Sequence, residues 1–218
     1  KKMENHPLTM VLTASLIEDP NDTLERIKNK WSEVCDQTES KRHQSMKIAL
    51  KMSYDAIVMT PGAVTLWGLI AVLSANFSTY FINALKHISP EISWDDALRA
   101  LSSRSLVQFS VNGKSLHMLM PVKAQWERLA GKKEKRECYA LWAKLIGYVA
   151  MQADSCEHTH DARLSNSIRG VVFECMRSFM MITEFLIQDG QIEAAEKCIN
   201  AMQDYYESLS CLLYTSDA

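Results

Sequence analysis

The sequence predicts a mostly α-helical protein that carries one small β-hairpin. Apolar residues recur at three- and four-residue intervals along most of the chain, which is the spacing of one helical face. Between Leu106 and Met120 the interval shortens to two residues, which is the spacing of a β-strand. The dipeptide Asn112-Gly113 interrupts this stretch, and it is a strong signal for a tight hairpin turn.

The composition is that of a globular chain. It has 218 residues, of which 47% are hydrophobic and 23% charged, with only seven Gly and five Pro. Such a chain can bury a core and is neither disordered nor fibrous. Its formal net charge of -2 gives no general attraction to nucleic acid or anionic lipid. The six cysteines lack the dense spacing of a disulfide scaffold, so we expect reduced thiols in a cytoplasmic protein.

Neither a signal peptide nor a membrane span is predicted. The longest apolar run, Val64 to Leu73, has half of the ~20 residues that a spanning helix needs. Because the chain does not start with Met and enters an apolar segment at once, we expect a fragment whose upstream part is missing. Residues 210–218 resemble translated adapter sequence, so we expect a non-native tail that fits no element.

Residues 1–40 are predicted to contain a helical hairpin. Apolar residues lie on one helical face between Leu8 and Leu16, and again between Leu24 and Trp31. Pro20 disfavours helix at the residue before it, and Asp22 or Thr23 can cap the second helix.

Residues 41–131 begin with a set of helices. One helix is expected over about Lys41–Ile57, stopped by Thr60-Pro61-Gly62, and a nearly all-apolar central helix over about Ala63–Ser74. Ser78 opens a third helix. Ser93 opens a fourth, with Asp95 and Asp96 in the first turn where the helix dipole favours acids.

The β-hairpin follows these helices directly. In a type I′ turn both central residues need positive φ, which Asn112 and Gly113 tolerate. Pro121 suits the first position of the next helix, because its missing N–H would have no intrahelical partner there. Helices followed by a two-stranded wing describe a winged-helix domain.

Residues 132–209 are predicted to form long helices joined as hairpins. Asp189-Gly190 separates the last two. Large residues at Phe179, Ile182 and Leu186 and small ones after Gly190 have offsets that resemble one tetratricopeptide-type unit. A single unit does not establish a repeat, since helical hairpins in general share this spacing.

Over residues 5 to 130 the order of these patterns resembles the STAND/NB-ARC-type signal-transduction ATPases. The segments that carry the resemblance are Asn5-His6-Pro7-Leu8, Ser53-Tyr54, Leu66-Trp67, Leu69 to Leu73, Ala97-Leu98, Arg104 to Val107, Val122-Lys123 and Trp126. In that family a nucleotide-binding α/β domain precedes a helical domain, a winged-helix domain and usually a ligand-sensing repeat array. The resemblance implies a switch between a closed ADP form and an oligomerising ATP form.

The resemblance also implies two nucleotide-binding residues. Pro7 matches the proline that packs on the adenine ring, although Asn5 replaces the family's usual Gly. The family's Met-His-Asp sensor aligns with Met118-Leu119-Met120, where neither of the last two side chains can donate a hydrogen bond to phosphate. His117 lies two residues before Leu119 and should share its strand face, so it could supply the donor from a shifted register.

The chain by itself is not expected to be an enzyme. No Gly-x-x-x-x-Gly-Lys-[Ser/Thr] occurs in it, so nothing in it can cradle the phosphates of ATP. ADP or ATP would bind only together with the missing upstream nucleotide-binding domain. The other expected partners are a protein or small-molecule ligand of the helical hairpins and, on activation, further copies of the protein.

Two alternative interpretations involve other ligands. Cys156 to Asp161 is the one dense cluster of metal-competent residues, with Cys138 and Cys175 within reach in a helical hairpin. It lacks paired Cys-x-x-Cys spacing and fits a capped loop better. A winged-helix DNA-binding regulator is the alternative function. Asp95 and Asp96 on the candidate recognition helix, against Arg99 and a single wing cation at Lys114, disfavour it.

Overall fold

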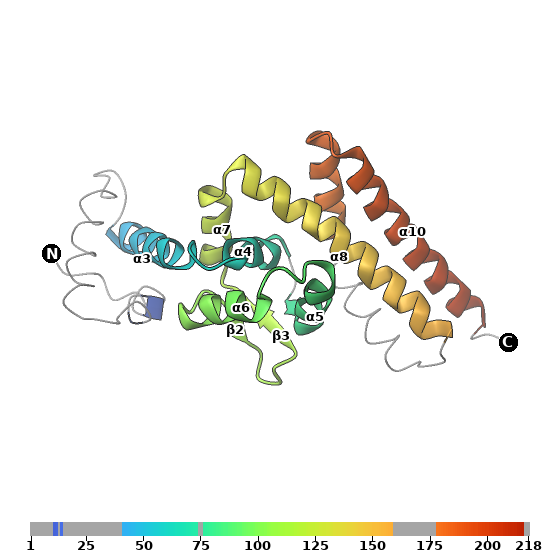
Figure 1. The fold of residues 1–218 in the computed structure, drawn as a ribbon, viewed down its shortest axis with the longest axis horizontal. Helices are drawn as coiled ribbons and strands as arrows, with labels where there is room; N and C mark the ends of the chain where they lie inside the picture. Colours follow the sequence, from blue (N-terminus) through green and yellow to red (C-terminus); the bar gives the residue numbers. More distant parts are fainter. Residues whose placement is uncertain (1–10, 13, 15–40, 74–75, 159–177, 216–218) are drawn as a thin grey trace.

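The computed structural model describes residues 11, 12, 14, 41–73, 76–158 and 178–215 (Figure 1). These residues are mostly helical and include a small three-stranded antiparallel sheet, which confirms the predicted mostly-α class. Most of the predicted hairpin between Pro7 and Cys35, Pro7 itself included, lies outside the described residues. Leu12 is described and is fully buried in the core.

Four helices form the first half of the described chain: α3 (Lys41–Ile57), α4 (Ala63–Val72), α5 (Thr79–Ile88) and α6 (Trp94–Ser103). Gly62 takes the positive φ of 78° that the turn between α3 and α4 requires. As predicted, α4 is buried over most of its surface and lies at the centre of the molecule. It ends at Val72, two residues before the predicted end.

The two predicted helix starts differ in chemistry. Ser78 caps α5, since its hydroxyl accepts a hydrogen bond from the Tyr80 N–H at 3.2 Å. Ser93 occupies the N-cap of α6 but makes no such side-chain cap. Its hydroxyl instead donates to the Asp96 carboxylate at 2.6 Å. The side chain at the N-cap position is therefore bonded to an acid of the first turn and not to a backbone N–H.

The sheet has one more strand than the sequence predicts. Its strands are β1 (Phe77–Ser78), β2 (Gln108–Phe109) and β3 (Ser115–His117), in the order β1-β3-β2. Leu116 of β3 lies opposite Phe77 on one side and Phe109 on the other. The two-residue β1 escaped prediction because it is too short to show an alternating pattern.

The predicted type I′ turn is wrong. Only Gly113 has positive φ, at 68°, and the ribbon closes over a longer loop in which the Ser110 N–H donates to the Ser115 carbonyl. The Asn112 side chain accepts hydrogen bonds from the Ser110 hydroxyl and the Lys114 N–H. These bonds hold Asn112 out of the left-handed region, so a longer loop replaces the tight turn.

The second half of the chain is built from longer helices: α7 (Met120–Leu129), α8 (Lys132–His158), a helical stretch over residues 178–188 and α10 (Ile192–Thr215). Pro121 is the second residue of α7, since the helix begins one residue before the predicted start. Figure 1 shows α8 and α10 side by side, in yellow-orange and red. The α10 helix continues to Thr215, which corrects the expectation that residues from Ser210 onward fit no element, because extending a formed helix costs little.

One hydrophobic core joins the two halves. The Trp142 indole N–H of α8 donates to the Leu69 carbonyl of α4 at 3.1 Å. The Trp142 ring also contacts Phe77 of β1, Phe81 of α5 and Phe179 of the 178–188 helix. The small sheet and the long helices are therefore packed against each other across the predicted domain boundary at residue 131.

Candidate functional site

The outer face of β3 is the first candidate site. Burial alternates along this strand: Leu116 and Met118 are buried, His117 is half-buried, and Leu119 is 41% exposed. His117 and Leu119 therefore lie on the same outward side, at the positions that the sequence analysis compares with the family's sensor. Met120, the next residue, is exposed at the first position of α7.

His117 has a polar neighbour on the adjacent strand. Gln108 of β2 is its register partner, and the Gln108 Oε1 lies 3.1 Å from the His117 Nε2. With the proton on Nε2, His117 donates this bond, and the imidazole ring is held on the ribbon surface. The sequence analysis did not identify Gln108. The hairpin register places Gln108 opposite His117, and the position of the predicted turn could have indicated that register.

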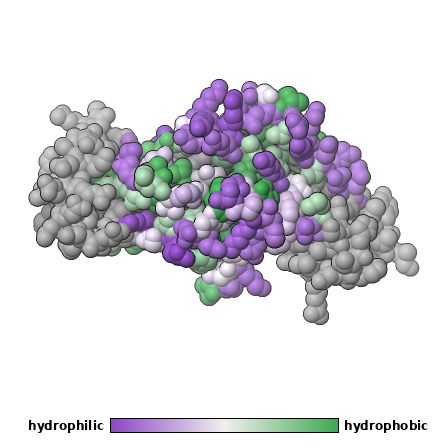
Figure 2. All heavy atoms as spheres, in the orientation of Figure 1, coloured by the Kyte–Doolittle hydropathy of each residue, from purple (hydrophilic) through white to green (hydrophobic). Residues whose placement is uncertain are grey.

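The ribbon projects from the body and has little charge of its own. Figure 2 shows hydrophilic atoms over most of the described surface, with a small hydrophobic group at the end of the projecting ribbon. Val111 in the loop is fully exposed, and Phe109 is nearly half exposed. Lys114 is the single cationic residue between Gln108 and His117.

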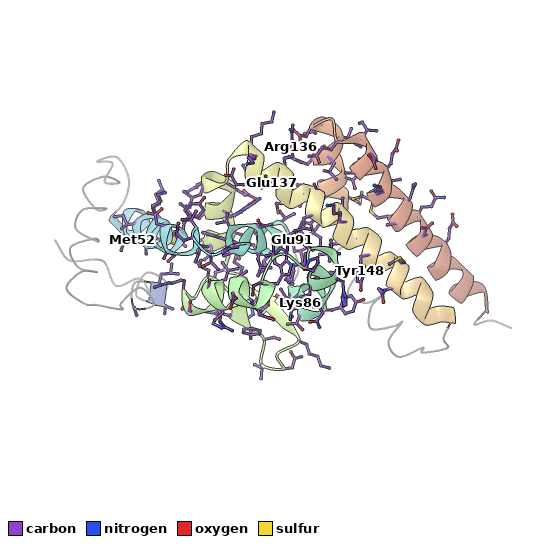
Figure 3. The ribbon with its side chains drawn as sticks, in the orientation of Figure 1. Met52, Lys86, Glu91, Arg136, Glu137 and Tyr148 are labelled. Carbon is purple, nitrogen blue, oxygen red and sulfur yellow. The ribbon has the colours of Figure 1, made fainter. Side chains whose placement is uncertain are left out.

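The exposed face of α6 pairs its own charges. Asp96 forms an ion pair with Arg99 at 2.8 Å, and Asp95 forms one with Lys86 of α5 at 2.8 Å (Figure 3 labels Lys86). All four side chains are exposed, so each pair adds little stability. Their effect is to leave no excess of positive charge on this helix.

The predicted metal cluster falls at the edge of what the structure describes. The Cys156–His158 backbone ends α8, whereas the side chains of that segment, residues 159–161 and Cys175 lie outside the described part. Among the described residues no group of three His, Cys, Asp or Glu side chains could hold a metal ion. Cys138, which the metal hypothesis invoked, is fully buried, and burial raises the pKa of its thiol far above the usual range.

An apolar groove runs between the 178–188 helix and α10. It has a volume of about 660 Å³, and the apolar side chains that line it are Met180, Met181, Ile187 and Met202. The first three are about half exposed or more. Flexible methionines suit adaptable apolar contacts, so this groove is where the helical hairpin can meet another apolar surface.

A buried carboxylate fixes the geometry of this hairpin. Asp189 in the turn before α10 accepts two hydrogen bonds from the Arg136 guanidinium of α8, at 2.7 and 3.1 Å, and one from the Gln191 amide at 3.0 Å. The bond from Arg136 (labelled in Figure 3) is the largest cause that lowers the pKa of Asp189 to about 2. The sequence marked Asp189 only as a turn residue, since its partner is 53 positions away.

Comparisons with known proteins return no relative: no family model, no curated protein and no solved structure matches this chain. Among the described helices none is long and apolar enough to cross a membrane. The described residues offer two features that could bind another molecule: an imidazole on a projecting ribbon and an apolar groove on a helical hairpin.

Proposed function

We propose that this chain is the regulatory and interaction part of a cytoplasmic, nucleotide-switched signalling ATPase of the NB-ARC type. In this proposal α4, α5, α6 and the sheet act as a winged-helix domain. The helices from α8 onward act as tetratricopeptide-like hairpins. The nucleotide-binding domain belongs to the part of the parent protein that precedes Lys1.

The observation that carries the proposal is the strand order. A helix, a short strand, two helices and a hairpin follow one another, and the far strand of the hairpin pairs with the early strand to give β1-β3-β2. A winged helix would have this strand order, with the β2–β3 ribbon as its wing, so the order supports the proposal. The third strand was not part of the sequence prediction, so it supports the assignment independently of the patterns that suggested it.

His117 is the proposed contact to nucleotide. Its ring lies on the outer face of the wing, where the Nε2–H that bonds Gln108 can be redirected to the phosphates of ADP held by a neighbouring domain. Leu119, at the family's histidine position, cannot do so. The resemblance also assigns Pro7 to the adenine ring, and that assignment stays a prediction.

The hairpins are proposed to carry the sensed ligand. Because Trp142 ties α8 to α4 and packs on β1, movement of the hairpins would carry the wing with it. Ligand binding could thus pull the His117 face away from ADP and release the protein for oligomerisation. Movement of the hairpins and movement of the wing are coupled in this proposal because the two share one hydrophobic core.

The alternative of DNA binding lacks the charge that it needs. A helix that enters the major groove normally presents Lys or Arg to phosphates and base edges. On α6 the exposed acids Asp95 and Asp96 offset the single Arg99, and the wing loop adds only Lys114.

The test extends the chain by the coding sequence that precedes Lys1, where the proposal expects the nucleotide-binding domain. Calorimetric titration with ADP should show binding, weakened about tenfold by His117→Ala through loss of one charge-assisted hydrogen bond. Lys114→Ala, which removes a charge from the same ribbon, should leave the affinity unchanged. Leu119→His restores the family's donor at an exposed position and should tighten binding.

Two results would contradict the proposal. One is an extended chain that folds but does not bind ADP. The other is a salt-dependent mobility shift of duplex DNA by the 218-residue chain, which would favour the DNA-binding alternative.

A further inference from the structure

We propose that the outer face of the hairpin formed by the 178–188 helix and α10 docks an amphipathic helix of a partner protein, one whose apolar stripe is flanked by Lys or Arg. This face contains the apolar groove of about 660 Å³. The proposal rests on the proposed function in one respect, since it names the chemistry of the ligand that the hairpins are proposed to sense. Its test needs neither nucleotide nor the domain expected before Lys1, so either proposal can fail without the other.

Apolar side chains that reach the surface are concentrated on these two helices. All six are exposed or half-buried: Met180, Met181, Ile187, Ile192, Ile199 and Met202. Four of them line the groove, and Ile192 and Ile199 lie on the flank of α10 that Met202 occupies, ten and three residues before it. Together with Glu184 and Glu196 they make up the groove face. Single exposed apolar residues are normal, but a contiguous group of them marks an interaction site.

Both helices place the same pattern on the groove face. An exposed acid has an apolar residue four positions before it and another three positions after it, at Glu184 as at Glu196. These spacings keep each acid beside the apolar residues of its own helix. Glu184 lies four residues before the helix end at Gln188, and Glu196 lies four residues after the start of α10 at Ile192. Because the chain turns back between those ends, the two carboxylates lie at about the same height along the hairpin.

The charges of the groove face favour a cationic partner. Within the described residues neither Glu184 nor Glu196 has a cation within ion-pair distance. Glu184 lines the groove and accepts a hydrogen bond from the neutral Gln188 amide at 3.3 Å, which leaves its charge uncompensated. By contrast, Glu193 on the opposite flank of α10 is paired with Lys197 at 2.7 Å. A docked helix with Lys or Arg on both sides of its apolar stripe would neutralise the two unpaired acids.

The same charges disfavour two other occupants. In a symmetric pair of chains the acids of the two groove faces would lie opposite each other, and like charges in contact repel. A surface of anionic lipid would be repelled for the same reason. The groove also suits a helix in length, since Met180 and Ile187 are about 10 Å apart along their helix, which two turns of a partner would cover.

The experiment titrates the 218-residue chain with a capped peptide of leucine, alanine and lysine, whose leucines form one helical stripe with lysines on both sides. One control peptide has glutamate at every lysine position, and a second has the original composition in scrambled order. The lysine peptide should bind saturably at one site by calorimetry, about tenfold more tightly than either control. Its amide NMR shifts should be confined to the 178–188 helix and α10.

Three variants test the residues of the groove face. Glu184→Lys combined with Glu196→Lys should reverse the preference, so that the glutamate peptide binds about tenfold more tightly than the lysine peptide. Ile187→Gln should weaken the lysine peptide about tenfold and keep the melting temperature, because this side chain is already half exposed. Asp204→Asn is the control, since Asp204 is exposed two residues after Met202 and so points to the other side of α10. It should leave both affinities unchanged.

The proposal is overturned if the lysine peptide binds no more tightly than the scrambled one, or if the charge-reversed chain still prefers lysine. It is overturned in favour of a second copy if sedimentation shows a dimer that Ile187→Gln dissociates. Binding of the chain to anionic vesicles that the same variant abolishes would overturn it in favour of a membrane surface.

Discussion

The indole ring of Trp126 in α7 lies directly against Gly68 in α4. A methyl group at Gly68 would stand 2.4 Å from Trp126 Cζ2, well inside contact distance. Gly68 is therefore what allows α7, which leads out of the wing, to approach the central helix so closely. Both residues are buried, and the Trp126 indole N–H has no hydrogen-bond partner among the described residues.

Gly68→Ala should destabilise the chain by about 1–3 kcal/mol, because overpacking forces the ring or the helix to move. The free energy of unfolding by urea measures this. Gly147→Ala in α8 is the matched control, since its added methyl would meet nothing within 4 Å. There the higher helix propensity of Ala should stabilise the chain by about 0.5–1 kcal/mol. Equal effects of the two substitutions would contradict the close packing of Trp126 on Gly68.

The Asp189 carboxylate predicts a defined acid sensitivity. Its pKa in the folded chain is about 2, against about 3.9 when unfolded. Because the folded pKa is the lower of the two, its stabilising effect is complete above pH ~4 and is lost as the pH falls toward 2. Asp189→Asn should therefore lower stability at pH 7 and make little difference near pH 2.

The control for this titration is Asp204→Asn, at an exposed α10 position without an ion pair among the described residues. Urea unfolding at a series of pH values compares the two variants with the unchanged chain. An Asp189→Asn variant as stable as the unchanged chain at neutral pH would show that the contacts from Arg136 and Gln191 add nothing.

Lys123 links the start of α7 to the end of α4. Its ammonium donates to the Leu73 carbonyl at 2.6 Å, and partial burial lowers its pKa. Lys123→Met keeps the aliphatic stem and removes the bond, so we expect a loss of about 1 kcal/mol after screening by solvent. Lys144→Met on α8 is the control for loss of charge alone. Indistinguishable unfolding curves for the two variants would contradict this role.

The thiols of Cys138 and Cys198 should be unreactive in the folded chain. Both are fully buried, and burial raises the pKa of Cys198 to about 11 and that of Cys138 higher still. Reaction with a thiol reagent at pH 8 should be slow for both residues and should become fast in denaturant. Mass spectrometry of the labelled peptides gives the rates, and rapid native labelling of either residue would contradict its burial.

The same thiols predict weaker stability in alkali. A folded pKa above the unfolded value of about 8.5 means that burial of the neutral thiol stabilises the fold below that pH and is lost as the pH rises through it. Cys138→Ala or Cys198→Ala should therefore show a smaller decline in stability between pH 8 and 10 than the unchanged chain.

Local patterns predicted most of the helices, because apolar spacing and stop signals such as Thr60-Pro61-Gly62 act within a few residues. Strand β1 was missed, since its two residues become a strand only by pairing with Leu116. The turn type was wrong because an Asn112 side-chain hydrogen bond overrode the usual preference of Asn-Gly. In both places a contact outside the local pattern determined the backbone structure.

The candidate sites were harder to predict from the sequence than the helices. His117 could be placed on the outer strand face from period-two alternation alone. The Gln108 contact, the Arg136–Asp189 bridge and the groove between the 178–188 helix and α10 each join residues that are distant in sequence or lie on different elements. No local pattern brings those pairs together; helix packing does.

Amide hydrogen exchange of the chain extended by the coding sequence that precedes Lys1, with and without ADP, tests the central claim most directly. We expect ADP to slow exchange in Leu116–Met120 and the first turn of α7, and His117→Ala to abolish this protection. ADP bound with protection confined to the upstream domain, and with these segments unchanged, would contradict the nucleotide-switch assignment of the wing.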